Sequence, residues 1–70
     1  MVSTNRYDQA IIDFTKSIEL DPKNDKTYFY RGLAFGLKGN EDLAIADCKV
    51  AARLGNSNAQ KFLQVRGLNW

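Results

Sequence analysis

The sequence predicts an all-α fold of antiparallel helix-turn-helix repeats, a fragment of an α-solenoid with about four helices. The main observation is an internal repeat, because a shift of 34 residues places Gln9 to Phe14 on Leu43 to Cys48. The same shift aligns four further pairs, namely Asp8 with Asp42, Leu20 with Leu54, Asn24 with Asn58, and Tyr28 with Phe62. Apolar residues also recur at helical intervals between turn residues. Repeats of this length stack side by side, and their usual role is to hold other proteins.

The first two helices are delimited by a proline and a glycine. The first spans residues 7–20 and carries its apolar residues at helical intervals: Tyr7, Ala10, Ile11, Phe14 and Ile18. Pro22 ends it, because a proline ring disfavours helical geometry in the residue before it. Asn24 or Asp25 supplies the side-chain oxygen that caps the second helix, and Gly39 stops that helix in a left-handed conformation.

Two more helices follow, from Asn40 to about Leu54 and from about Asn58 to Arg66. Asn40 is expected to cap the third helix and Gly55 to stop it. Asn56 or Ser57 is expected to open the fourth helix and Gly67 to stop it. No linker or second domain is evident, so residues 1–70 are expected to form a single domain.

Composition limits the possible functions. Seventy residues bury only about 60% of the surface of the unfolded chain, so stability is expected to be marginal. No run approaches the roughly 18 apolar residues of a membrane span, and the polar start lacks the apolar core of a signal peptide. The single cysteine, Cys48, cannot form an internal disulfide. We therefore expect a cytoplasmic protein without membrane contact.

Two stretches carry a recognisable motif. One reads Tyr28-x-x-Arg31-Gly32-x-x-Phe35 and continues with Ala44 and Cys48. The other comprises Tyr7, Ala10, Phe14, Ser17 and Pro22. Over roughly residues 7–63 the chain thus resembles the tetratricopeptide repeat (TPR) family, with Arg31 in place of a leucine and Cys48 in place of an aromatic residue.

The resemblance implies repeats made of a helix A followed by a helix B. Residues 7–22 are then helix B of an incomplete repeat, residues 25–56 a complete repeat, and residues 57–67 a C-terminal capping helix. Because residues 1–6 are too few to form a helix A, we expect the first helix to expose an apolar stripe that suits self-association or exchange of elements between copies. The stripe comprises Tyr7, Ile11, Phe14 and Ile18.

The resemblance also implies a concave groove lined by the A helices. Its positions correspond here to Lys26, Tyr30, Leu33 and Leu37, and the last helix would add Gln60, Leu63 and Gln64. The spacing puts the first four on one helical face, opposite the packing residues Tyr28, Gly32 and Phe35. Such a face suits an extended peptide or a partner helix. Alternatively, Leu33 and Leu37 pack against the neighbouring helix.

No catalytic residue, metal site or cofactor is expected. The chain has no histidine, the commonest general base and a frequent zinc ligand. Cys48 occupies a packing position and is expected to be an inert buried thiol. Basic residues such as Arg31 are interspersed with acidic ones such as Asp47, which indicates a mixed, solvated surface. We therefore expect a protein or peptide partner, with self-association as the second hypothesis and nucleic-acid binding as a weaker third.

Overall fold

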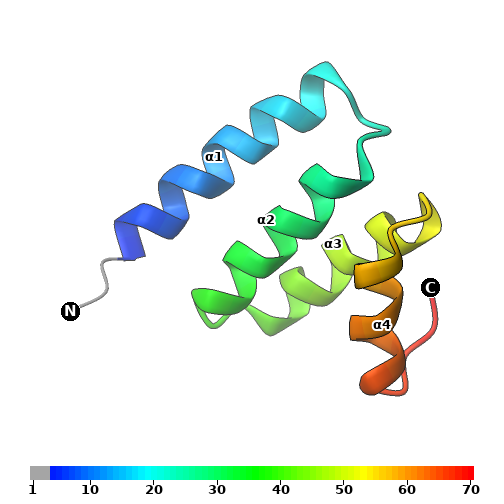
Figure 1. Cartoon of the computed structure of the whole chain (residues 1–70). Coiled ribbons are helices and arrows are strands. Elements are labelled where there is room, and N and C mark those ends of the chain that lie inside the picture. Colours follow the sequence, from blue (N-terminus) through cyan, green and yellow to red (C-terminus); the bar gives the residue numbers. More distant parts are fainter. Residues whose placement is uncertain (1–3) are drawn as a thin grey trace.

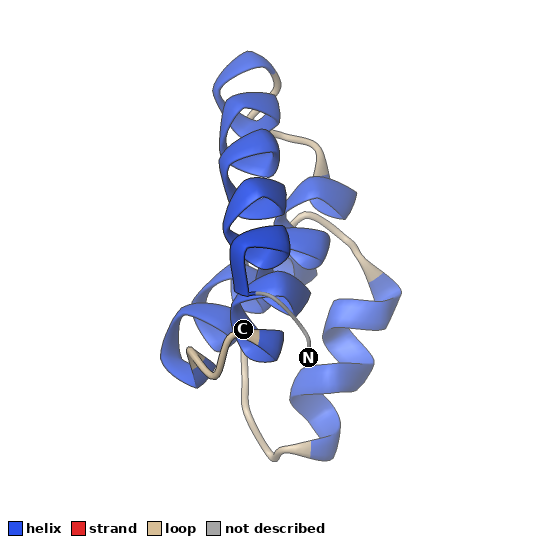
Figure 2. Cartoon of the chain, turned by 90° about the vertical axis from the view of Figure 1, so that its left-hand side faces the viewer, coloured by secondary structure: helices blue, strands red, loops and turns tan. Residues whose placement is uncertain are grey.

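The computed structural model describes residues 4–70, which form four α-helices (Figure 1). These are α1 (Thr4–Leu20), α2 (Asp25–Leu37), α3 (Glu41–Arg53) and α4 (Ser57–Val65). Helices α1, α2 and α3 follow one another in alternating directions, and α4 turns away from their common axis (Figure 1). The view in Figure 2 shows the same described helices joined by short loops. The all-α prediction is confirmed, while the expectation for residues 1–3 lies outside the described residues.

The helix stops are confirmed at all three predicted glycines. Gly39, Gly55 and Gly67 have φ angles of +91°, +100° and +70°, a region that side chains with a Cβ rarely adopt. The N–H of the residue after each glycine then donates to a carbonyl five residues back. The N···O distances are 2.8 Å for Asn40 to Phe35, 3.0 Å for Asn56 to Ala51 and 2.9 Å for Leu68 to Leu63. These bonds satisfy carbonyls that the helix ends would leave unpaired.

The helix starts were harder to predict. Helix α1 begins at Thr4, before the predicted Tyr7, because the apolar pattern marks only the face that packs and the polar residues ahead of it continue the helix. The Asn24 side chain accepts from the Lys26 N–H at 3.1 Å, as predicted. Asn56, one of the two candidates for α4, accepts from the Ala59 N–H at 2.8 Å. Asn40 makes no side-chain bond to α3, so its predicted capping bond is wrong.

Helices α2 and α3 cross closely at Gly32. A Cβ at this glycine would lie 3.1 Å from the Ala44 carbonyl oxygen and 3.1 Å from the Cys48 Sγ. Only a residue without a side chain leaves both helices in place, which agrees with the packing role expected for Gly32. The α2–α3 pair shares the most extensive contact between helices of the described chain.

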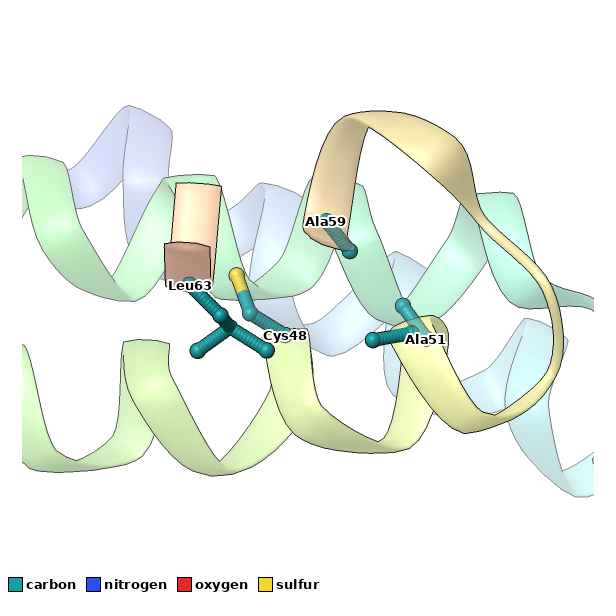
Figure 3. Close-up of a cluster of buried hydrophobic side chains, with 5 residues drawn as sticks. Cys48, Ala51, Ala59 and Leu63 are labelled. Atoms are coloured by element: carbon teal, nitrogen blue, oxygen red, sulfur yellow. The ribbon is translucent and has the colours of Figure 1, made fainter. Parts of the chain in front are cut away.

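The core lies between α3 and α4 and is built largely from small residues. Its buried members are Cys48, Ala51, Ala52, Ala59 and Leu63. Figure 3 shows Leu63 of α4 beside Cys48 of α3. The burial expected for Cys48 is confirmed, since its side chain is almost fully enclosed. None of the helices formed by residues 4–70 has both the length and the apolarity needed to cross a membrane.

Candidate binding groove

A pocket of about 300 Å³ opens between α2, α3 and α4. It is lined by Gly32, Leu33, Gly36, Leu37, Glu41, Ala44, Cys48, Phe62 and Arg66. Gly32 and Gly36 of α2 and Ala44 of α3 have little or no side chain. The two helices therefore approach each other closely and leave the space beside their crossing unfilled. The walls are mainly apolar, which favours an apolar guest over a polar one.

The polar groups of the pocket are joined to each other. Arg66 donates from Nε and Nη2 to Oε1 of Glu41, at 3.3 Å and 3.2 Å. Its guanidinium carbon also lies 4.0 Å from the centre of the Phe62 ring, a cation–π contact. Both charged side chains remain exposed to water, so this ion pair contributes little to stability. It joins the beginning of α3 to the end of α4 beside the pocket.

The predicted groove residues of α2 do not stay together. Leu33 and Leu37 line the pocket and are 40% and 65% exposed, so they are not core residues. The Tyr30 ring instead lies 6.1 Å from the ring of Phe14 on α1. Lys26 is exposed but does not line the pocket. Only two of these four residues therefore line the pocket.

The predicted groove residues of α4 are also divided. Leu63 is 0% exposed, so its placement in an open groove is wrong. Ala59 is equally buried and lies four residues earlier, so both are on the side of α4 that faces α3. The Gln60 side chain is held by a 3.0 Å bond from its Nε2 to the Ala52 carbonyl. Gln64 is exposed and does not line the pocket.

Seven lining residues were not predicted as groove residues: Gly32, Gly36, Glu41, Ala44, Cys48, Phe62 and Arg66. One available signal was the four-residue spacing of Gly32 and Gly36, which removes two side chains from one face of α2. The contribution of α4 gave no comparable signal, since it depends on how that helix lies across α3.

The apolar stripe predicted on α1 is partly covered. Tyr7, Ile11, Phe14 and Ile18 are all half-buried, and the Phe14 ring meets Tyr30 of α2. The stripe is therefore only partly uncovered, because Phe14 packs against Tyr30 of α2. The large apolar side chains that α1 does expose are Ile12, at 49%, and Leu20, at 89%.

A polar network connects the first three helices. Arg31 of α2 donates from Nε to Asp47 Oδ2 at 2.7 Å and from Nη2 to Asp47 Oδ1 at 2.8 Å. Its Nη1 donates to the Thr15 Oγ1 of α1 at 3.3 Å. The hydrogen bond with Asp47 raises the pKa of Arg31 above its ordinary value. The sequence had indicated a solvated surface, but Asp47 is buried and this pair is a structural link.

The thiol of Cys48 is poorly suited to nucleophilic chemistry. Its burial, together with the negative charge of Asp47, raises the pKa of Cys48 to about 11. The thiol is therefore protonated at neutral pH, whereas a nucleophile requires the thiolate. Within residues 4–70, no three or more acidic, cysteine or histidine side chains gather as a metal-ion site.

Comparison with known families agrees with this architecture. The model of the TPR repeat family matches residues 2–39, which is more than half of the chain. The chain therefore belongs to the TPR repeat family. The match covers α1 and α2. The assignment of α3 and α4 to the same kind of repeat rests on the internal 34-residue repeat. No curated protein and no solved structure matches the chain. Repeats of this family generally mediate binding to other proteins and are not themselves enzymes.

Proposed function

We propose that this chain is a protein-interaction module that holds a peptide or a partner helix in the groove between α2 and α4. The observation that carries the proposal is the pocket of about 300 Å³ with Leu33 and Leu37 exposed at its wall. Both leucines project from a helix that is fixed by the Gly32 crossing and by the Arg31–Asp47 pair. A fixed apolar surface loses little conformational entropy on binding, which favours affinity.

The lining determines what the partner presents. An apolar side chain that enters the pocket removes its own surface and that of the two leucines from water. A polar group at the same depth would lose its hydration, and the apolar walls offer it few hydrogen-bond partners. Glu41 and Arg66 provide polar contacts beside the pocket for the backbone or flanking residues of the partner. The partner is thus a segment with at least one bulky apolar anchor.

The test uses a peptide selected on the folded chain from a displayed peptide library. Leu33→Ser and Leu37→Ser are each expected to weaken its binding by about 1–3 kcal/mol in calorimetry, the range of interface anchors. The matched control is Leu43→Ser, since Leu43 is also an exposed leucine, at 46%, but lies outside the pocket. Melting curves of these variants should stay close to that of the parent chain.

Two results would contradict the proposal. One is equal loss of binding in the Leu37 and Leu43 variants, which would show that the pocket does not hold the peptide. The other is a Leu33→Ser variant that melts as early as Gly32→Leu, in which a side chain is forced into the helix crossing. In that case the face of α2 assigned to recognition belongs to the core.

Self-association through α1 is the second candidate function. It is supported by the incomplete burial of Tyr7, Ile11, Phe14 and Ile18 and by the exposed Ile12 beside them. Light scattering at micromolar and millimolar concentrations should detect an increase in molar mass with concentration. A monodisperse monomer at both concentrations would end this hypothesis.

A further inference from the structure

Two arginines of the described residues lie over aromatic rings. The Cζ of Arg31 is 5.8 Å from the centre of the Tyr28 ring and 5.8 Å from that of the Phe35 ring. The Cζ of Arg66 is 4.0 Å from the centre of the Phe62 ring, and among residues 4–70 no second ring lies over it. A planar guanidinium has two faces that can stack on rings. Arg66 thus contacts one ring where Arg31 contacts two.

The hydrogen bonds of Arg66 leave the faces of its guanidinium free for stacking. Its Nε and Nη2 donate to Oε1 of Glu41, and such N–H bonds lie in the plane of the group. Phe62 covers one of the two faces. The Arg66 side chain is still 40% exposed, so part of it remains accessible. Glu41, Phe62 and Arg66 all line the pocket, so the accessible guanidinium lies at the site proposed for the partner.

The pocket also has the size and the walls that suit a flat ring. Its volume is about 300 Å³, whereas a cavity of roughly 150 Å³ between apolar side chains already binds benzene. Gly32 and Gly36 add no side chain to its wall, and Ala44 adds only a methyl group. A wall without bulky side chains can contact the whole face of a planar ring. An aromatic side chain therefore has room in the pocket beside Arg66.

We propose that the anchor of the partner is an aromatic side chain, whose ring enters the pocket and lies against the face of Arg66 that Phe62 leaves uncovered. The proposal rests on the function proposed above, because it names the chemical class of that partner's anchor. The charge of the guanidinium is complementary to the negative face of the ring. An aliphatic anchor of the same size would bury as much apolar surface but would lack this attraction.

The test compares two rings of similar size, one aromatic and one saturated. An alanine scan of the peptide selected from the displayed library locates its anchor, and the peptide is then synthesised with phenylalanine or with cyclohexylalanine at that position. Cyclohexylalanine is the more apolar of the two, so burial alone predicts that it binds at least as tightly. With Arg66 against the ring, the phenylalanine peptide is expected to bind the parent chain about two- to fivefold more tightly in calorimetry.

Two variants show whether Arg66 is the source of this preference. Arg66→Met removes the charge and keeps an unbranched side chain, so the preference for phenylalanine should disappear. Glu41→Gln is the matched control, because it weakens the same ion pair but leaves the guanidinium in place, and the preference should persist. Both variants should melt like the parent chain, since this exposed ion pair contributes little to stability.

Either of two results would overturn the proposed anchor. One is a cyclohexylalanine peptide that binds the parent chain as tightly as the phenylalanine peptide does. The other is an unchanged preference for phenylalanine in Arg66→Met. Leu37→Ser separates these failures from failure of the proposed function. If it weakens both peptides alike, the pocket holds the peptide and only the chemistry of the anchor is wrong, whereas if it weakens neither, the peptide binds elsewhere and both proposals fail.

Discussion

Replacing Gly32 with alanine tests whether the helix crossing is as close as the structure indicates. The added methyl group would lie 3.1 Å from the Ala44 carbonyl oxygen, 3.1 Å from the Cys48 Sγ and 3.3 Å from the Asp47 Cβ. The carbonyl is part of the α3 backbone and cannot rotate away. The Cys48 side chain is enclosed by the core. Relief of the clash therefore requires the two helices to separate slightly.

Two opposing effects set the magnitude. Alanine is favoured over glycine inside a helix by roughly 0.5–1 kcal/mol, whereas one extra carbon in a filled space costs about 1–3 kcal/mol. We expect Gly32→Ala to be destabilising by about 1 kcal/mol, which corresponds to a melting temperature lower by about 4–8 °C for a domain of this size.

Gly36 provides the matched control. A Cβ at Gly36 would meet only the Ala44 Cβ, at 3.7 Å, which is an ordinary contact. Gly36→Ala should therefore stabilise the chain by roughly 0.5–1 kcal/mol. Urea unfolding followed by circular dichroism compares the two variants in one helix and one assay. If Gly32→Ala proves as stabilising as Gly36→Ala, the close crossing of α2 and α3 is refuted.

Three further substitutions test other parts of the structure. Arg31→Leu should lower the free energy of unfolding by on the order of 3 kcal/mol, because Asp47 would stay buried without its partner. The double variant with Asp47→Ala should recover much of that loss, which a double-mutant cycle measures. The Cys48 pKa is raised in the folded state from 9.0 to about 11, so its contribution to stability is complete below pH 9 and is lost as the pH rises toward 11. Urea midpoints between pH 7 and pH 11 should therefore fall less steeply in Cys48→Ala, and parallel curves would contradict this. Asn56→Ala should destabilise the chain by about 1–2 kcal/mol through loss of the α4 cap, whereas Asn58→Ala, at an exposed position, should be nearly neutral. The reverse order in thermal melts would contradict Asn56 as the cap.

The helix ends could be predicted because they depend on local chemistry. A glycine with positive φ stops a helix wherever a Cβ would be strained, so three stops could be located without knowledge of the fold. The start of α4 was less certain. The two candidates were Asn56 and Ser57. Asn56 is the cap, and its Nδ2 also donates to Asp25 Oδ2 at 2.9 Å. That second bond reaches from α4 back to α2, so only the tertiary structure could decide between the candidates.

The sequence alone determined the class of this protein. Its 34-residue repeat, its helical spacing of apolar residues and the motif around Gly32 define an all-α array of the TPR type. The groove required the tertiary structure. Leu63 and Phe62 are neighbours in sequence, yet Leu63 is buried against α3 and Phe62 lines the pocket. The rotation of α4 about its axis separates them. That rotation is set by packing over the whole helix interface, which no single residue specifies.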